Sequence, residues 1–422
     1  MTTDSYGNLT SEGVAAYLKE KEIFPEGAHL TVEDLHAVKE SIEGFVNLIY
    51  HVYDDKGKSI ILKQMLEFPR YRIEDEKNDT VEAEDAGEDG GWTLDLGRMR
   101  SEIAVLIFWN TVCPGICPEM YLFDEANRII VMEDLMALSL LRFDLCRMVK
   151  HPSFPERIGT FFARNLFFSS NLHLTRYKKS EVERFFVNPE YNALCSSIFE
   201  DNIAVSMKRK MAPGTEAKRK ELVDNPKISA EVKHLRENFM ENKECLIHTD
   251  LHSSNIMINQ EDVRIIDGEF GGFGPLAQDF GRLTASLSLN YISWFGDNEK
   301  SAPEKANYQV YLCETIESLY HVFQQEFRNL VATYQEESYS LKILDVDSYL
   351  IKQLQDALSY AGANITSRLA NRGICYDISR LPKENRTLPS ILGMTVAEEL
   401  LLNHENYTSI EAYTKFLKNL AK

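Results

Sequence analysis

Three polar residues in the second half of the chain have the types and the spacing that phosphoryl transfer requires. Asp250 follows an apolar stretch, Asn255 comes five positions later, and Asp267 comes twelve positions after that. Such a reaction needs a carboxylate that orients the attacking hydroxyl and takes its proton, together with hard oxygen ligands that hold Mg²⁺ against the nucleotide phosphates. The pattern H-x-D-x-x-x-x-N, followed by an Asp at the end of a strand, provides both. We therefore predict that Asp250 is the catalytic base and that Asp267 and Asn255 bind magnesium.

A second motif in the sequence is also typical of metal binding. Asp279-Phe280-Gly281 spells the metal-binding triplet of protein kinases, but it follows a glycine-rich loop and stands where we expect a helix from Leu283 onward. We predict instead that Asp279 caps that helix or accepts hydrogen bonds from the backbone of the catalytic loop. Glu269 lies two residues after Asp267, and we predict that both carboxylates hold the metal.

Residues that could bind a nucleotide lie upstream. Lys63 ends an apolar strand, as a phosphate-pairing lysine does, and Glu102 lies in the next helix, where its carboxylate could hold that lysine. The segment from Gly44 to Asn47 could cover the phosphates, and the backbone of residues 131–135 could hydrogen-bond an adenine ring. The nucleotide-binding residues that we predict are Gly44, Asn47, Lys63, Glu102, Glu133, Asp134, Leu135, Asp267, Gly268 and Glu269.

The elements that must position these residues change in character along the chain. Residues 46–53 and 59–65 are typical of a β-hairpin, residues 98–112 of a buried helix, and residues 128–132 of a strand. Helical periodicity dominates from residue 136 onward. The sequence therefore predicts an α+β protein with a strand-rich lobe over residues 1–135 and a mainly helical lobe over residues 136–422. Residues 74–91 carry nine acidic side chains and one lysine, which favours a solvated insertion in the first lobe.

Composition restricts the partners. The 422 residues include 46 basic and 65 acidic side chains, a net charge of −19, so we expect neither nucleic acid nor an anionic membrane as a partner. No stretch is apolar enough to span a bilayer, and the N-terminus lacks the features of a signal peptide. The seven cysteines are scattered, which favours reduced thiols and a cytoplasmic protein.

With these motifs in place, the sequence resembles the aminoglycoside phosphotransferase and choline kinase superfamily, and within it most closely the methylthioribose kinases. The resemblance rests on GFVNLIYHVYD, IILKQ, VMEDL, FVNPE, LIHTDLH, IDGEFGGFGP and YAGANITSRLA. It implies a bilobal protein-kinase-like fold and a kinase that uses ATP and Mg²⁺ to phosphorylate the 1-hydroxyl of 5-methylthioribose in methionine salvage. It also implies a small-molecule acceptor contacted by Asp250, and a possible homodimer.

The acceptor end departs from the family's pattern. Members carry an Arg pair on a late helix, where this chain has Ser367 and Arg368. We predict that Arg368 binds the acceptor, and Arg372 could share its helix face. Because of Ser367, a paralogous kinase acting on another sugar or small alcohol stays an alternative. A nucleotide-binding pseudokinase with a regulatory role is a further alternative, although Lys63, Asp250 and Asp267 are all present.

Overall fold

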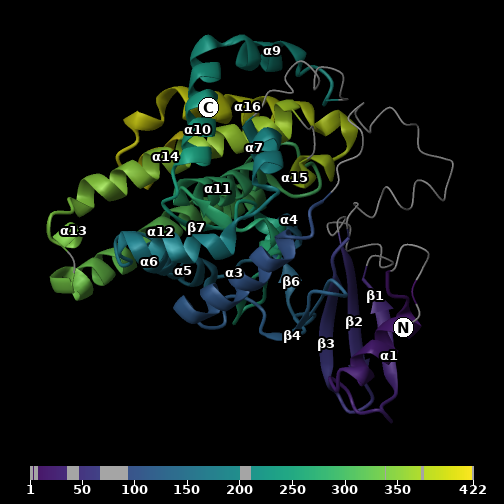
Figure 1. Ribbon diagram of the computed structural model, residues 1–422. Helices are drawn as coiled ribbons and strands as arrows, with labels where there is room; N and C mark the ends of the chain where they lie inside the picture. The colour runs from purple at the N-terminus through teal and green to yellow at the C-terminus, as the bar shows by residue number, and fades with distance from the viewer. Residues whose placement is uncertain are drawn as a thin grey trace.

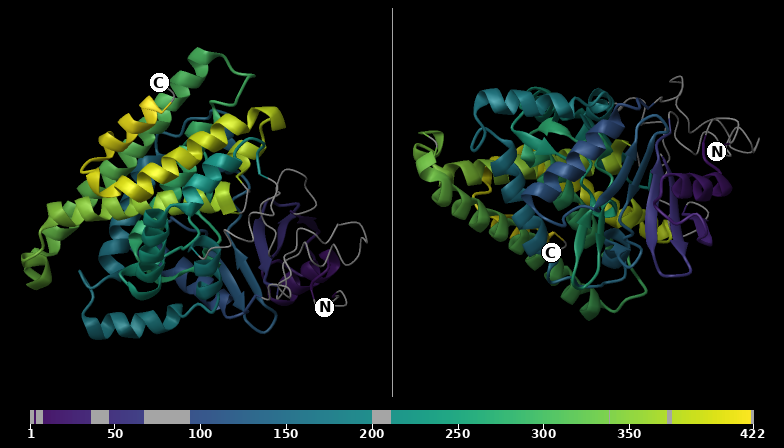
Figure 2. Two further views of the ribbon diagram at one scale, coloured as in Figure 1. Left: turned by 90° about the horizontal axis from the view of Figure 1, so that it is seen from above. Right: turned by 60° about the horizontal axis from the view of Figure 1, so that its bottom comes forward.

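A strand-rich part near the N-terminus adjoins a larger helical part (Figures 1 and 2). The computed structural model describes residues 3, 8–35, 47–66, 94–199, 211–337, 339–371 and 375–420. This arrangement confirms the predicted α+β class, with an antiparallel sheet on one side and a helical body on the other. Gly44, Arg372 and the acidic segment 74–91 lie outside the described residues, so what we predicted of them stays a prediction.

The larger sheet has five antiparallel strands in the order β1-β2-β3-β5-β4. They are β1 (Leu30–Asp34), β2 (Leu48–Asp54), β3 (Ser59–Gln64), β4 (Met120–Asp124) and β5 (Ile129–Met132). The predicted hairpin is confirmed as β2 and β3. Side chains of β2 alternate between buried and half-buried, as expected when a strand has one fully covered face. Helix α1 (Ser11–Glu20) packs on that face through Val14, Tyr17 and Leu18.

Helix α3 (Arg98–Val112) connects the two parts and has the bounds that the sequence predicts. The register of the sheet pairs Lys63 with Ile130, so both face the side of the sheet that α3 covers. The first half of α3 packs Met99 and Ile103 against Ile130 and its neighbours. Its second half, around Trp109, belongs to the core of the helical part. Glu102 therefore lies at the junction.

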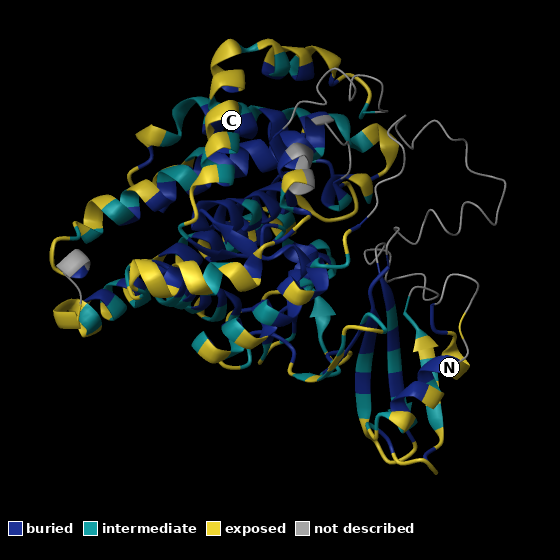
Figure 3. Ribbon diagram, in the orientation of Figure 1, coloured by how far each residue is buried: buried dark blue, intermediate teal, exposed yellow. Residues whose placement is uncertain are grey.

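Helices make up most of the remaining chain, and their inward faces form the largest core (Figure 3). They are α4 (Leu141–Cys146), α5 (Phe154–Ser169), α6 (Arg176–Glu183), α7 (Tyr191–Phe199), α9 (Glu216–Asp224), α10 (Pro226–Glu241), α11 (Leu276–Ser293), α12 (Ala302–Tyr334), α13 (Tyr339–Lys342), α14 (Val346–Thr366), α15 (Tyr376–Ser379), α16 (Thr387–Asn403) and α17 (Ile410–Asn419). In the part of the chain that the structure describes, none of them is both long and apolar enough to cross a membrane. The lobe boundary at residue 135 stays a prediction.

Five short strands in two small sheets carry the loops of the candidate site. Strand β7 (Cys245–Ile247) pairs with β10 (Gly272–Gly274), and β8 (Ile256–Ile258) pairs with β9 (Val263–Ile265) and with β6 (Ser139–Leu140). The β8–β9 hairpin is the one predicted between Asn255 and Asp267. Both residues therefore emerge at the same end of this hairpin.

One predicted boundary is wrong. Helix α11 begins at Leu276 rather than at Leu283, so the Asp279-Phe280-Gly281 triplet lies inside the helix. Gly281 does not interrupt it, because this residue is where α11 approaches α14 most closely. A Cβ atom there would clash with the backbone of Ala357. The glycine serves helix packing at this position.

Candidate active site

Lys63 is the centre of a buried ion-pair network at the junction. Its Nζ atom donates to both carboxylate oxygens of Glu102 at 2.9 Å and to Asp267 Oδ1 at 2.6 Å, and Glu269 Oε2 lies 3.9 Å away. Burial by itself would lower the pKa of Lys63, but Asp267, Glu102 and Glu269 outweigh it and raise that pKa above its ordinary value. Burial also raises the pKa of Glu102. The lysine is therefore charged, and it is the principal counter-charge of three carboxylates.

A residue that sequence reasoning missed holds the third carboxylate. Arg98 is fully buried, and its Nε donates to Glu269 Oε2 at 3.1 Å while its Nη2 donates to Asn47 Oδ1 at 2.8 Å. Asn47 Nδ2 donates in turn to Glu269 Oε2 at 2.8 Å. A local signal existed, because Arg98 precedes Glu102 by one helical turn and shares its face.

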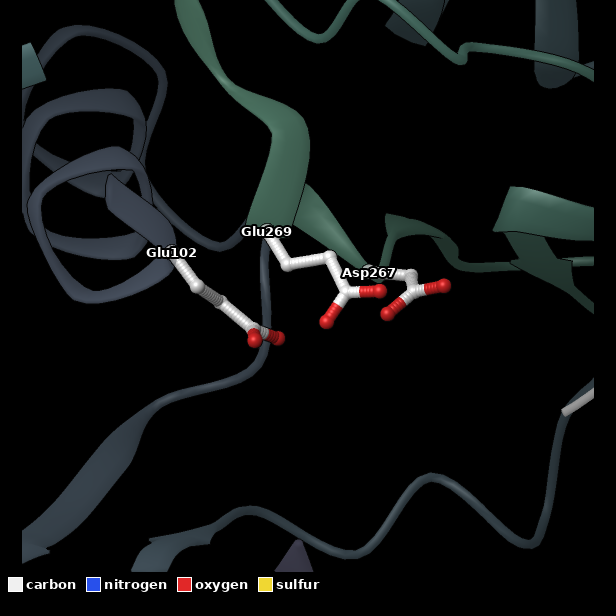
Figure 4. A group of neighbouring side chains, drawn as sticks. All are labelled: Glu102, Asp267 and Glu269. Atoms are coloured by element: carbon white, nitrogen blue, oxygen red, sulfur yellow. The ribbon is translucent and has the colours of Figure 1, made fainter. Parts of the chain in front are cut away.

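The three carboxylates form the candidate metal site. One oxygen from each of Glu102, Asp267 and Glu269 lies within 4.8 Å of the others, and Figure 4 shows the three side chains converging from α3 and from the loop after β9. Such oxygen ligands are those that magnesium prefers, so the residues present fit a divalent cation. Glu102 is occupied by Lys63 and Glu269 by Arg98 and Asn47, which leaves Asp267 the carboxylate with the most exposed oxygens.

The loop that carries Asp267 and Glu269 is tightly packed. Asp267 has a left-handed backbone (φ 64°), which Asp tolerates better than most residues. A Cβ atom on Gly268 would lie 2.7 Å from Val105 of α3, so only glycine fits there. Asn188, from the FVNPE stretch, donates to the carbonyl oxygens of Glu269 at 2.8 Å and of Gly271 at 3.2 Å. The structure thus gives Gly268 and Asn188 positioning contacts.

Asp279 holds the catalytic loop. Its two carboxylate oxygens accept hydrogen bonds from the backbone N–H groups of His248, at 2.6 Å, and Thr249, at 2.8 Å. Of the two roles that the sequence left open for Asp279, loop support is confirmed and helix capping is wrong, because Pro275 occupies the N-cap of α11. Burial raises the pKa of Asp279 to about 6. The support matters because Thr249 has a left-handed backbone (φ 74°) that its β-branched side chain disfavours.

Asp250 lies next in the loop and is surrounded by cations. Its Oδ1 forms an ion pair with Nη2 of Arg282 on α11, and its Oδ2 lies 3.5 Å from His252 Nε2. Arg142 Nη2 lies 3.2 Å from the other ring nitrogen of His252. Burial opposes ionisation, but Arg282, His252 and Arg368 hold the pKa of Asp250 well below its usual range. Asn255 Nδ2 donates to the carbonyl oxygen of Asp250 at 2.9 Å, which leaves its own carbonyl oxygen as the candidate metal ligand.

Arg368 belongs to the same group. It extends α14 as part of the turn Ser367–Asn371, and it is partly buried. Burial, Arg282 and Arg142 lower the pKa of Arg368 to about 10, and Asp250 opposes them. The charges of the predicted Arg368 and the predicted Asp250 therefore influence each other. Sequence reasoning missed Arg142 and Arg282, which lie on α4 and α11 and follow no recognisable motif.

The predicted adenine-binding stretch lies between the two parts. Glu133 donates its backbone N–H to Glu119 at 2.8 Å, and its side chain accepts from Arg264 Nη1 at 3.0 Å. Asp134 Oδ2 lies 3.1 Å from His51 Nε2, and Leu135 is buried. The stretch is thus fastened to both parts, and its role toward a nucleotide stays a prediction.

Two comparisons of the sequence with known proteins agree with this chemistry. Residues 198–319 match the family model described as "Phosphotransferase enzyme family". The chain is 28% identical to a methylthioribose kinase of Geobacillus sp. (strain WCH70), over 98% of this chain and 96% of the relative. It is also 28% identical to a methylthioribose kinase of Cronobacter sakazakii, over 91% of each chain. Among solved structures, a glucosamine kinase matches with a TM-score of 0.49 at 14% identity, over 90% of this chain and 83% of the other.

Proposed function

We propose that this chain, a kinase that transfers phosphate to a hydroxyl group and resembles the methylthioribose kinases along nearly its whole length, phosphorylates the 1-hydroxyl of 5-methylthioribose. The observation that carries the proposal is the network in which Lys63 binds Glu102 and Asp267 at the junction that also holds Asp250. The acceptor is taken from the names of the relatives, which cover more than nine-tenths of the chain. The reaction would serve methionine salvage, as the resemblance implies.

Lys63 and Asp267 would bind different parts of the nucleotide complex: Lys63 the phosphate oxygens and Asp267 the metal. When ATP binds, Lys63 Nζ would donate to its phosphate oxygens and keep its bonds to Glu102, which holds the side chain at the junction. Asp267, Glu269 and Asn255 would hold Mg²⁺. Bound magnesium would neutralise charge on the β- and γ-phosphates. Asn47, Gly44 and residues 133–135 would contact the remaining nucleotide.

Asp250 would act on the acceptor. A carboxylate oxygen would accept the hydrogen bond of the 1-hydroxyl and aim its oxygen at the γ-phosphorus. The new oxygen–phosphorus bond would form as the bond to the β–γ bridging oxygen breaks, its electron pair leaving with ADP. The hydroxyl proton would pass to Asp250. Because the surrounding cations hold the pKa of Asp250 so low, this proton would move late, once the attacking oxygen has become acidic.

A second candidate is a paralogous kinase with a different acceptor. The observation that favours it is Ser367, a buried residue that stands where the resembling family carries an arginine. A serine neither provides the guanidinium nor fills its volume. The recognition of the sugar would then differ even though the nucleotide end stays the same.

A panel of acceptors tests both candidates. Purified enzyme, ATP and Mg²⁺ would be incubated with 5-methylthioribose, ribose, glucosamine, choline and other small alcohols, and ³¹P NMR would detect the new phosphate ester. The matched control is 5-methylthioribose without its 1-hydroxyl. We expect methylthioribose to have the highest kcat/KM and the deoxy control to be inert. A higher kcat/KM for another acceptor would support the paralogue, and no transfer to any would contradict both.

A further inference from the structure

Three arginine side chains gather at the acceptor end of the site. We call Arg142, Arg282 and Arg368 the arginine cluster. The charges of Arg282 and Arg368 act on one carboxylate, Asp250, and Arg142 contacts His252 beside it, in a chain whose net charge is −19. His252 adds no charge, because burial lowers its pKa to about 3. Buried cations are costly unless an anion joins them. The cluster is therefore suited to a bound anion.

Arg282 has hydrogen-bonding capacity to spare. Its Nη2 pairs with Asp250, and its Nη1 donates to Asn364 Oδ1 at 2.7 Å. Its Nε is buried and has no hydrogen-bond partner among the described residues. A buried donor without an acceptor is unfavourable. An arginine that keeps such a donor is poised for an acceptor that arrives with the substrates.

The support of Arg282 is rigid. Asn364 of α14, its partner, donates to the carbonyl oxygen of Tyr360 at 2.8 Å and to Gln278 Oε1 at 3.3 Å. Gln278 donates to the carbonyl oxygen of Thr249, beside Asp250, at 3.2 Å. The chain of contacts returns to the catalytic loop, so Arg282 and Asp250 keep a fixed relation. By contrast, Arg142 is directed at His252 and Ser253, one step further from the carboxylate.

The position of the transferring group follows from these contacts. If the acceptor oxygen binds Asp250, the phosphorus that it attacks lies about 3 Å beyond it. A guanidinium on the same carboxylate is then within reach of the phosphoryl oxygens, to which its planar fork can donate twice. We propose that Arg282 is a catalytic residue that binds the transferring phosphoryl group. This inference rests on the proposed phosphoryl transfer, but it does not depend on which sugar is the acceptor.

Arg282 would change its partner during the phosphoryl transfer. As the γ-phosphorus leaves the β–γ bridging oxygen and bonds to the acceptor oxygen, the hydroxyl proton goes to Asp250 and the electron pair to ADP. The ion pair of Arg282 with Asp250 weakens as that carboxylate is neutralised. The guanidinium then pairs with the phosphate of the product. An anionic acceptor could also provide the oxygens that Arg282 binds. In that case the loss of Arg282 would raise the KM of the charged acceptor, whereas binding of the phosphoryl group predicts a lower kcat.

The kinetic test uses Arg282→Met and Arg282→Lys in the full chain, with the best neutral acceptor from the panel. Arg164→Met is the matched control, because Arg164 pairs with Glu326 at 2.8 Å between α5 and α12, outside the site. We expect Arg282→Met to lower kcat roughly 10²–10³-fold, with the KM for ATP changed less than about twofold. Added guanidinium should restore part of the rate to Arg282→Met. Arg282→Lys should recover little, because an ammonium lacks the planar fork.

A binding test needs no acceptor. Inorganic phosphate would be titrated into the ADP complex of each variant by calorimetry, and we expect Arg282→Met to weaken the binding of phosphate at least about tenfold.

Full activity of a folded Arg282→Met, or full recovery by Arg282→Lys without rescue by guanidinium, would overturn the proposal. A loss confined to the KM of charged acceptors would also overturn it, because the anion would then belong to the acceptor. If methylthioribose fails in the panel but phosphate binding still depends on Arg282, only the proposed acceptor is wrong.

Discussion

At the nucleotide end of the site, three carboxylates surround Lys63 and Arg98, whereas at the acceptor end the charges of two guanidinium groups, Arg282 and Arg368, act on one carboxylate, Asp250. The first group has an excess of negative charge and the second an excess of positive charge. A divalent cation complements the first, and phosphoryl oxygens complement the second. The contrast indicates how a strongly acidic chain can bind an anionic group. Binding depends less on the net charge of the chain than on the few cations that contact the group.

The largest effect should come from the carboxylate at the acceptor end. We expect Asp250→Asn to lower kcat roughly 10²–10⁴-fold, because an amide takes no proton and no longer pairs with Arg282. Nucleotide affinity should change little, since Asp250 belongs to the acceptor end. Steady-state kinetics and titration of MgATP would measure the two quantities. A comparable loss of MgATP affinity would mean that the two ends do not act separately.

A substitution of Lys63 tests the nucleotide end of the site. A charge pair at 4 Å is worth on the order of 4 kcal/mol at an effective dielectric of ~20, before desolvation, so Lys63→Met should raise the KM for ATP strongly. It should also lower the melting temperature, because Glu102 and Asp267 lose their buried partner. Adding Glu102→Gln should restore part of that stability and none of the ATP affinity. A double variant with normal KM would remove Lys63 from the nucleotide site.

Asp267 and Asp279 separate metal binding from loop support. We expect Asp267→Asn to weaken the Mg²⁺ dependence of nucleotide binding while the melting temperature is kept. Asp279→Asn should instead cost about 1–3 kcal/mol of stability, because an amide nitrogen would face a backbone N–H that the carboxylate now accepts. Magnesium titrations and thermal unfolding of both variants would check this. The opposite pattern would assign the metal to Asp279.

The smallest effect should come from the acidic segment. Replacing Glu74–Gly90 with a short Gly/Ser linker should leave melting temperature and kcat nearly unchanged, because the segment's composition offers little apolar surface to bury. Thermal unfolding and the acceptor assay would test it. A large loss of activity would mean that the acidic segment contributes to the nucleotide end of the site.

Much of the nucleotide end could be predicted because its signals are local. Asn255 and Asp267 are separated by a short hairpin, and β3, the strand that carries Lys63, has a clear pattern. Helix α3 could be placed to the residue, and with it Glu102. The start of α11 could not, because the stretch 276–282 has no clear start signal, and Gly281 within it serves packing against α14, which is far away in sequence.

The sequence by itself determined the class of chemistry: a base, a metal-binding carboxylate and a phosphate-pairing lysine at spacings that short elements fix. The tertiary structure decided which charges meet. Arg98 holds Glu269 across 171 positions, and Arg282 is joined to Asn364 across 82. Neither pair shares a local period, because their contact depends on how α3 meets the loop after β9 and how α11 packs on α14. The charge at the acceptor end is therefore a property of helix packing, which no motif records.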